Sequence, residues 1–328
     1  MSSRYVQPLR LLVQIGFFLV ALQTGWAFYR FATIVSAGGD ALRPSGMDAF
    51  LPISGLFGSM LWLKGGELNP LHPAAVYWFL IVLGLSLFLR RAFCSWVCPV
   101  GALSEWLWKL GFTLRKRSVV VPRVLDRILR SIKYILLAFF LGTAVLWPVG
   151  ALRSFLLSEY HLVSDIRLLQ LFTHASVTTM VVLMLLFALS LILKNPFCRY
   201  ICPYGALTGL AGLLSPVSVV RDADRCVSCG VCSQVCPAAL DVMHVATVRN
   251  PECFGCWRCI SYCRVHSALS MRFTRRFALP GILYALAVLF LVLGGIGIAK
   301  YRGEWHNRVT PEVYHMLLAP DKSGTVQQ

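Results

Sequence analysis

Long apolar runs dominate the chain, and five of them approach the roughly 20 residues that a helix needs to cross a bilayer. None of the five carries an acidic residue. We therefore predict five membrane-spanning helices, at residues 9–34, 73–89, 132–147, 175–193 and 279–299. A sixth apolar stretch, 50–63, is short and interrupted by Pro52 and by glycines. We interpret it as a re-entrant or interfacial segment.

Composition agrees with a membrane protein, since 57% of the 328 residues are hydrophobic and only 14% are charged. Soluble domains average about 45–50% apolar and about 25% charged residues. The net charge of +17 follows the predicted topology: 22 Lys and Arg residues fall in segments expected inside and 8 in segments expected outside. The N-terminus and segment 194–276 are therefore expected in the cytoplasm and the C-terminal tail in the periplasm. Without a recognition motif, the charge does not indicate nucleic-acid binding.

Eight of the twelve cysteines form two runs, 226–236 and 253–263, that share the spacing C-x2-C-x2-C-x3-C. This spacing is typical of bacterial ferredoxins with two [4Fe–4S] clusters, in which the last cysteine of each run ligates the other cluster. Gly230 and Gly255 are expected to form the tight turns of the loops. Zinc sites normally use separate C-x2-C pairs, and disulfides belong to oxidising compartments. We assign Cys226, Cys229, Cys232 and Cys263 to one cluster, and Cys253, Cys256, Cys259 and Cys236 to the other.

The other four cysteines lie in a repeated motif, F-C-x3-C-P-x-G-A-L, at 93–103 and again at 197–207. Each copy follows a predicted span, so the repeat indicates two like units. If the motif is helical, both thiols of a copy share one face. Convergence of the copies would create a third metal centre or cluster, a redox-active set of thiols, or simple packing. The four residues are Cys94, Cys98, Cys198 and Cys202.

These two features together resemble the NapH-type membrane polyferredoxins, a group that includes MauN, the NosR regulators and the CcoG-type assembly proteins. The resemblance covers about residues 70 to 270. It implies an electron-transfer subunit of a quinol dehydrogenase, an oxidoreductase that exchanges electrons with the quinone pool. The chain departs from NapH by its fifth predicted span and its tail. It has no segment long enough for the flavin domain of NosR or the C-terminal domain of CcoG.

The predicted fold is an α-helical integral membrane protein with about five spans, an internal repeat and an inserted α+β ferredoxin-like domain. The expected parts are a four-helix membrane domain (1–215), a cytoplasmic two-cluster domain (216–274), a fifth helix (275–300) and a periplasmic tail (301–328). The expected location is the bacterial inner membrane. Two [4Fe–4S] clusters are the expected cofactors, a third metal centre or cluster is one of the alternatives for the repeat cysteines, and quinone or quinol is the expected substrate. The expected partners are membrane lipid and a cytoplasmic or periplasmic redox protein, which could be an iron–sulfur protein, a haem protein or a reductase subunit.

Two other functions fit the same motifs: a metal-reducing assembly factor of the CcoG type and a redox-sensing regulator of the NosR type. No catalytic residue can be assigned from the sequence. His72 and His174 precede the second and fourth spans, and His161 lies near Asp165. A histidine beside an acid at the membrane surface could accept protons from a quinol. The last eight residues have a composition typical of disorder.

Overall fold

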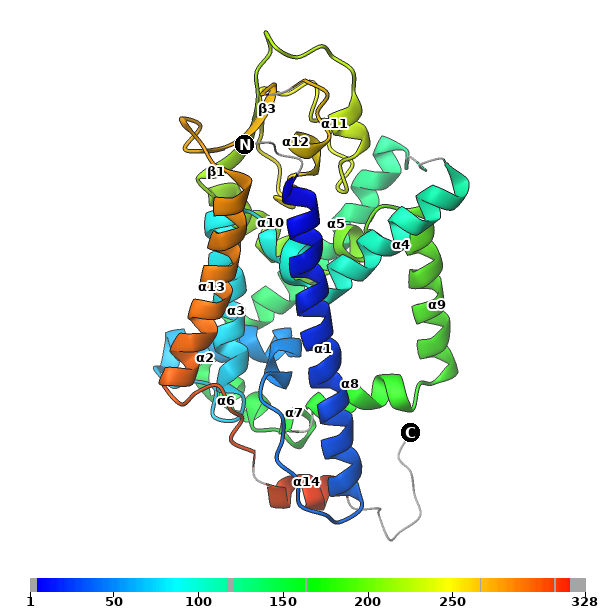
Figure 1. Ribbon diagram of the computed structural model, residues 1–328. Helices are drawn as coiled ribbons and strands as arrows, with labels where there is room; N and C mark the ends of the chain where they lie inside the picture. Colours follow the sequence, from blue (N-terminus) through cyan, green and yellow to red (C-terminus); the bar gives the residue numbers. More distant parts are fainter. Residues whose placement is uncertain are drawn as a thin grey trace. The chain divides into compact units, whose positions relative to one another are not determined.

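The computed structural model describes residues 5–116, 119, 121–162, 164–265, 267–309 and 311–318. This part of the chain is mostly helical, with one small sheet (Figure 1). Three of its helices are long and apolar enough to cross a membrane: α1 (Val6–Ser36), α5 (Arg123–Leu146) and α13 (Gly281–Tyr301). The chain therefore has the helices of a membrane protein.

Two further predicted spans form helices that differ from this simple pattern. Helix α3 (Pro73–Leu89) has the predicted bounds but only 17 residues. The fourth run forms α9 (Val177–Ile192), which is bent by 78° from the preceding α8 (Ser164–Thr173). The bend falls where Ser176 caps α9 by accepting a hydrogen bond from the Thr179 backbone N–H. The pair counts as at most one span, so the number of spans stays a prediction.

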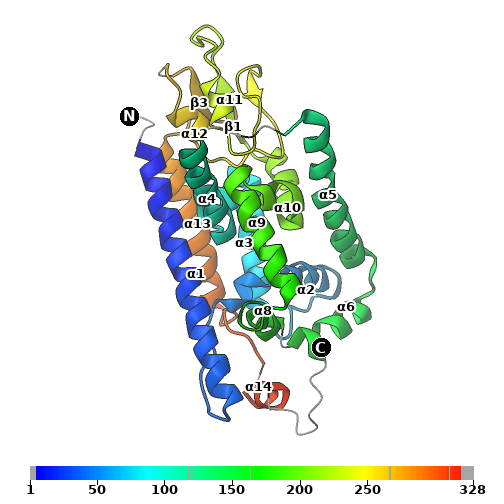
Figure 2. The same cartoon turned by 90° about the vertical axis from the view of Figure 1, so that its right-hand side faces the viewer.

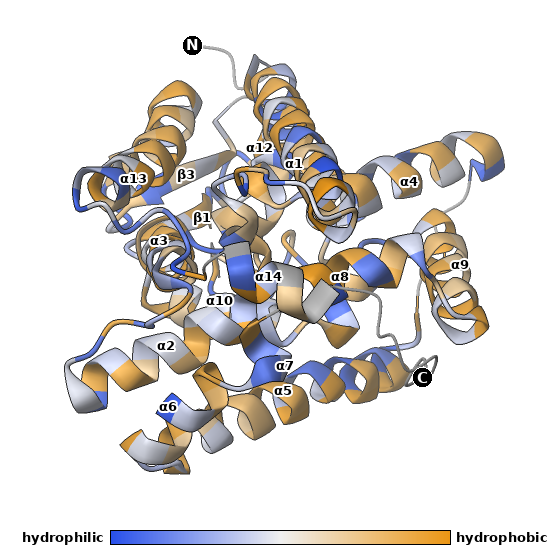
Figure 3. Cartoon of the chain, turned by 90° about the horizontal axis from the view of Figure 1, so that it is seen from below, coloured by the Kyte–Doolittle hydropathy of each residue, from blue (hydrophilic) through white to orange (hydrophobic). Residues whose placement is uncertain are grey.

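The distribution of apolar side chains is the one expected for helices that face lipid. Helices α9 and α13 are hydrophobic around most of their surface (Figure 3). Helix α5 begins earlier than the predicted apolar run, at Arg123, and its first turns are polar. There Asp126 and Arg130 form an i,i+4 ion pair of 2.7 Å, which supports the added helical turns. The remaining helical segments are short.

Their bounds are η2 (Met47–Phe50), α2 (Pro52–Gly65), η3 (Phe93–Val97), α4 (Pro99–Arg115), α6 (Val149–Leu156), α7 (Glu159–Leu162), η4 (Phe197–Ile201), α10 (Pro203–Ala211), η5 (Gly212–Leu214), α11 (Val231–Gln234), α12 (Arg258–Ser261) and α14 (Pro311–Leu318).

The chain divides into two compact units, and the first contains residues 1–19, 80–142 and 180–295. Its sheet is antiparallel in the order β2-β1-β3-β4, with β1 (Val217–Arg221), β2 (Thr247–Val248), β3 (Leu269–Phe273) and β4 (Phe277–Ala278). Val219 of the central strand pairs with Met271 on one side and Val248 on the other. These three side chains are buried, so one face of the sheet supports the cysteine loops. The sheet extends past the predicted domain boundary at residue 274.

Helices of the first unit pack closely where small residues allow it. Helix α4 lies beside α9 (Figure 2). A Cβ atom on Gly111 would lie 2.0 Å from the carbonyl oxygen of Leu191, so only glycine permits this approach. Ser104 and Ser190 are hydrogen-bonded between the same two helices at 3.3 Å. This contact fixes the segment that leads into the second cysteine repeat.

The second unit contains residues 20–79, 143–179 and 296–328. The predicted interfacial segment forms helix α2 of 14 residues, whose N-terminal half is buried. In the tail the structure describes residues 301–309 and helix α14 (Pro311–Leu318), and Trp305 and Tyr314 are buried in cores of this unit. The eight residues predicted to be disordered lie outside the described part of the chain.

Candidate metal centres

The two ferredoxin runs fold into matching loops, each followed by a one-turn helix. The residues on either side of the second cysteine have positive φ in both loops: Ser228 and Gly230 in the first, Gly255 and Trp257 in the second. The turn-forming role predicted for Gly230 and Gly255 is thus confirmed. Because two chemically different pairs adopt the same left-handed conformation, the loop geometry itself is what the fold preserves.

One cavity, which we call the outer site, is lined by one cysteine set drawn from both runs. It lies near the surface, since Cys229 is exposed and the neighbouring Val227 is 64% exposed. Hydrogen bonds from the backbone N–H of Ser228 and from Arg221 lower the pKa of Cys226. The set is Cys226, Cys229, Cys232 and Cys263.

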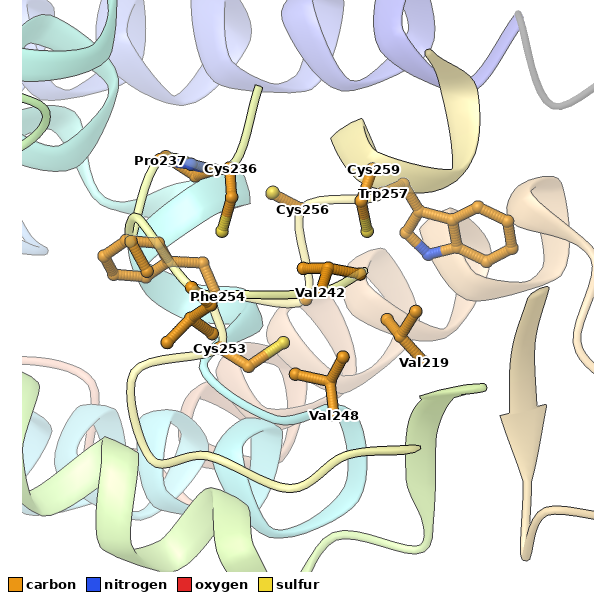
Figure 4. A pocket seen from close by; sticks show the side chains of 13 residues that line it. Val219, Cys236, Pro237, Val242, Val248, Cys253, Phe254, Cys256, Trp257 and Cys259 are labelled. Carbon is orange, nitrogen blue, oxygen red and sulfur yellow. The ribbon is translucent and has the colours of Figure 1, made fainter. Parts of the chain in front are cut away.

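A second cavity, the inner site, is lined by the complementary set, and the four sulfur atoms lie around it (Figure 4). Apolar side chains such as Val219, Val248 and Phe254 close its walls. Burial raises the pKa of Cys236 to about 12. A thiol of this kind ionises only when a metal or cluster supplies positive charge. The set is Cys236, Cys253, Cys256 and Cys259.

The two quartets fit [4Fe–4S] clusters. Each cavity takes three thiols from one run and one from the other, which are the two sets predicted from the spacing. Among the described residues, no group of three or more His, Cys, Asp or Glu side chains is arranged to hold a single metal ion. Ligation by these eight cysteines stays a prediction that the geometry supports.

A buried charge network borders the inner site. Glu105 of α4 accepts hydrogen bonds from Arg10 at 2.6 and 2.9 Å and from Arg258 at 3.1 Å. Burial would raise the pKa of Glu105, but the attraction of Arg10 and the other nearby cations brings it well below its usual range. Burial raises the pKa of Cys256, and the positive charges of Arg10 and Arg258 offset part of this rise. Both arginines thus place positive charge beside the inner thiols.

Sequence reasoning missed this network. Arg10 is one of few charged residues in the first apolar run, and it is 1% exposed. Gln7, one turn earlier on α1, donates a hydrogen bond to the carbonyl oxygen of Cys256 at 3.0 Å. The position of Arg10 at the start of an apolar run was a usable signal. If such a cation is buried, it needs a buried acidic partner, because an unpaired charge is too costly to bury.

A second buried carboxylate, Glu252, lies directly before the first cysteine of the second run. Lys133 of α5 binds both its oxygens at 2.6 Å, and Arg91 binds one at 3.0 Å. Tyr134 donates a further hydrogen bond at 3.1 Å. Burial would raise the pKa of Glu252, but Arg91 and Lys133 lower it. These contacts tie the inner loop to α5 and to the segment that follows α3.

The C-x3-C-P repeats have the same local structure but are not simple α-helices. Each first cysteine lies on a π-helical turn, η3 or η4. Each second cysteine, Cys98 or Cys202, is extended and precedes a helix that begins with proline. The expectation that both thiols share one α-helical face is therefore wrong in detail. A Cβ atom on Gly101 would lie 2.1 Å from the Cys94 carbonyl oxygen, which explains the glycine of the motif.

The structure brings the four thiols of the repeats together. Burial raises the pKa of Cys198 well above its ordinary value, and Cys94, Cys98 and Cys202 are close enough to raise it further. Burial likewise raises the pKa of Cys98 to about 12. Arg91 lies at the edge of this quartet and donates a hydrogen bond to the Cys198 carbonyl oxygen at 3.2 Å.

The first repeat also contacts the inner loop directly. Ser95 donates a hydrogen bond to the carbonyl oxygen of Phe254 at 2.7 Å, and the Trp96 indole N–H donates to that of Gly255 at 3.3 Å. The π-helical turn that carries Cys94 therefore supports the backbone between Cys253 and Cys256. The quartet of the repeats and the inner site are parts of one connected structure.

The histidines of the quinol hypothesis form a separate buried cluster in the second unit. His72 pairs with Asp48 at 3.0 Å, and its ring lies 5.7 Å from that of His161. His161 contacts Ser54, and burial with the nearby His72 lowers its pKa to about 4. His174 is exposed and is not part of the cluster.

Two family models match the cysteine-bearing segments. A model described as a 4Fe-4S binding domain matches residues 71–119 and 176–218, which are the two copies of the repeat. A model described as a 4Fe-4S dicluster domain matches residues 218–264, which contain both ferredoxin runs. The chain thus carries iron–sulfur domains over all twelve cysteines.

The similarity to known proteins extends over most of the chain. YccM of Escherichia coli, which is named as an electron transport protein, is 40% identical over 301 residues, or 90% of this chain and 84% of that protein. The chain belongs to the NapH-type polyferredoxin family. NapH of Escherichia coli is 29% identical, over 53% of this chain and 59% of that protein. MauN of Methylorubrum extorquens is 30% identical, over 57% and 61%. No solved structure matches the chain.

Proposed function

We propose that this NapH-type protein passes electrons between the quinone pool and a protein redox partner through [4Fe–4S] clusters. The observation that carries the proposal is the crossed pair of thiol quartets, because each cavity takes ligands from both runs as two-cluster ferredoxins do. When bound, each cluster supplies a one-electron carrier. The inner site adjoins membrane helices of its unit, and the outer site lies at the protein surface, so the two would connect a lipid-soluble and an aqueous partner.

The proposal includes a third cluster held by Cys94, Cys98, Cys198 and Cys202. Support comes from the mutual proximity of these four thiols, of which that of Cys198 belongs to a buried residue, and from the iron–sulfur model that matches both repeats. The guanidinium of Arg91 would offset part of the negative charge that four thiolates bring. The orientation follows the charge asymmetry: ferredoxin segment in the cytoplasm, tail in the periplasm, in the bacterial inner membrane.

The test is the iron and acid-labile sulfide content of the anaerobically purified full chain, with EPR spectra after reduction. Three [4Fe–4S] clusters correspond to about twelve irons per chain and two to about eight. The double variant Cys94→Ser, Cys198→Ser should lose about four irons and keep both ferredoxin signals. About eight irons in both proteins would overturn the third cluster, and zinc without iron would overturn the electron-transfer function.

A further inference from the structure

A cleft of about 550 Å³ lies beside α5 in the first unit and opens to the outside of the protein. Its walls come from one face of α5 and from the loop just before the inner run. Binding cavities for small molecules are typically about 300–1,000 Å³ in volume. The lining residues include Arg127, Tyr134, Ile135 and Ala138 on α5, and Pro251 and Glu252 on the loop.

The cleft is polar at one end and apolar at the other. Arg127, Arg130 and Ser131 line it over the first half of α5. Tyr134 lies at the middle of the helix, and Ile135 and Ala138 continue the wall beyond it. Ile135 is 66% exposed. Helix α5 is itself long and apolar enough to cross a membrane, so the apolar end faces the part of the helix suited to lipid. This arrangement matches a ligand with a polar ring and an apolar tail.

Hydrogen-bonding groups are held in fixed positions at the polar end. Tyr134 donates its hydroxyl hydrogen to Glu252, which leaves the hydroxyl oxygen able to accept a hydrogen bond. Glu252 cannot turn away, because Lys133 and Arg91 bind it from other sides. Arg130, which also lines the cleft, is held by an ion pair with Asp126 at 2.7 Å and by a hydrogen bond to the Ala238 carbonyl oxygen at 3.1 Å.

The polar end also adjoins the inner site. Glu252, which lines the cleft, is followed directly by Cys253, which lines the inner cavity. We propose that this cleft binds the ring of an isoprenoid quinol, with the Tyr134 hydroxyl oxygen accepting a hydrogen bond from a ring hydroxyl and Ile135 and Ala138 covering the start of the tail. This assignment rests on the proposed function.

The redox balance is simple. A quinol that becomes a quinone loses two electrons and two protons. The electrons go singly to two of the [4Fe–4S] centres, each a one-electron acceptor. The protons go to water at the open mouth of the cleft. The role of Tyr134 is to orient the ring, and no step depends on a change of charge at Glu252.

The test uses the full chain with its clusters in detergent. A photoreactive azidoquinone is cross-linked, and the labelled peptide is identified by mass spectrometry. Decylubiquinol and menadiol are used in parallel to reduce the clusters. Ile135→Trp narrows the cleft, whereas Ile132→Trp places the same bulk on an exposed α5 position (41% exposed) that does not line it. Tyr134→Phe removes only the hydroxyl.

In the wild type we expect labelling of the α5 peptide. Ile135→Trp should lower labelling and the rate of quinol-driven reduction at least about tenfold, which corresponds to about 1.4 kcal/mol of binding. Tyr134→Phe should lower quinol affinity about threefold, the effect of one hydrogen bond. Ile132→Trp should remain within about twofold of the wild type, and dithionite should reduce all these variants equally.

Two outcomes would overturn different claims. The proposed quinone function is wrong if the azidoquinone does not label the wild type and neither decylubiquinol nor menadiol, in reduced or oxidised form, exchanges electrons with its clusters. If the wild type reacts but Ile135→Trp matches Ile132→Trp, the function stands and the assignment of the cleft is wrong. Anionic phospholipid that co-purifies with the wild type and is lost from Ile135→Trp, with unchanged quinol rates, would make the cleft a lipid site instead.

Discussion

The outer and inner sites share a loop geometry but differ in their surroundings. Both are lined by four thiols, three from one run and one from the other. At the outer site Cys229 is exposed, whereas at the inner site Cys236 and Cys256 are each 8% exposed. Only the inner site is bordered by the Arg10–Glu105–Arg258 network. Equivalent ligand sets in unlike environments are expected to give unlike reduction potentials.

The difference also suggests a direction for contacts with partners. The outer site is accessible to a water-soluble electron-transfer protein, because its Cys229 is exposed at the surface where such a protein could dock. The inner site is enclosed by α1, α4 and α12 through the contacts of Arg10, Glu105 and Arg258. The cleft next to the inner site opens beside α5, a helix long and apolar enough to cross a membrane. The predictions below test whether the two sites are separable in this way.

Removing a ligand should have the largest effect. Cys256→Ser is expected to abolish the inner cluster and with it the quinol-driven reduction of the outer cluster, because the inner site is the one next to α5. Cys229→Ser should remove the outer cluster but leave quinol-driven reduction of the inner one. EPR of each variant after addition of quinol, and separately of dithionite, measures both. Normal outer-site reduction by quinol in Cys256→Ser would refute the order of the two sites.

Breaking the buried network should destabilise the protein strongly. Glu105→Gln removes the charge that compensates Arg10 and Arg258, and leaving buried charges unpaired costs about 3–5 kcal/mol. The matched control is Lys109→Gln, since Lys109 pairs with the same carboxylate at 2.9 Å but is 40% exposed. It should cost less than about 1 kcal/mol. Denaturant titrations of both variants in detergent give the values, and equal costs would contradict the argument.

Much of the site could be predicted from the sequence, because metal ligands are fixed by spacing. The assignment of Cys236 to the loop of the other run, for example, needs only the pattern C-x2-C-x2-C-x3-C. The positive φ of Gly230 and Gly255 follows from the same pattern and is confirmed. Three of the five predicted spans correspond to helices that are long and apolar enough to cross a membrane, α1, α5 and α13, and these were predictable because each contains a continuous apolar run.

The parts that could not be predicted depend on long-range contacts or local backbone detail. The π-helical turn before Cys98 depends on a Cys98 N–H to Phe93 carbonyl bond that the motif does not reveal. The pairing of Lys133 with Glu252 joins residues 119 positions apart. The 78° bend between α8 and α9 lies at the start of the predicted run 175–193, and the apolar pattern does not reveal it. In none of these three cases does the neighbouring sequence distinguish the observed structure from an ordinary α-helical turn, a solvent-exposed lysine or a straight helix.

Charge near the inner site should tune its reduction potential. Arg10→Gln removes one positive charge beside Cys256, so the reduced, more negative state loses stabilisation and the potential of the inner cluster falls. At an effective dielectric constant of about 20, one charge about 10 Å away is worth about 1.7 kcal/mol, which is on the order of 70 mV for a one-electron couple.

The control for this shift is Arg225→Gln, because Arg225 is 62% exposed and lies near the outer run, where water and salt screen its charge. Redox titration followed by EPR separates the two signals. We expect only the inner signal to move in Arg10→Gln and neither to move measurably in Arg225→Gln. A shift of the outer signal in Arg10→Gln would mean that the network acts through the fold as a whole.

The smallest expected effect is the pH dependence of the inner network. The pKa of Glu105 is lower in the folded protein than in the unfolded chain, where it is about 4.3. Its contribution to stability is therefore complete above that value and is lost as pH falls toward the folded pKa. The difference in Tm between the wild type and Glu105→Gln should stay constant from pH 8 to about 5 and narrow below about 4. This difference cancels the separate titration of His161, which both proteins share. A Tm difference that changes between pH 8 and 6 would show that the carboxylate is not held ionised by Arg10 and Arg258, and the inner site would then resemble the outer one in its electrostatics.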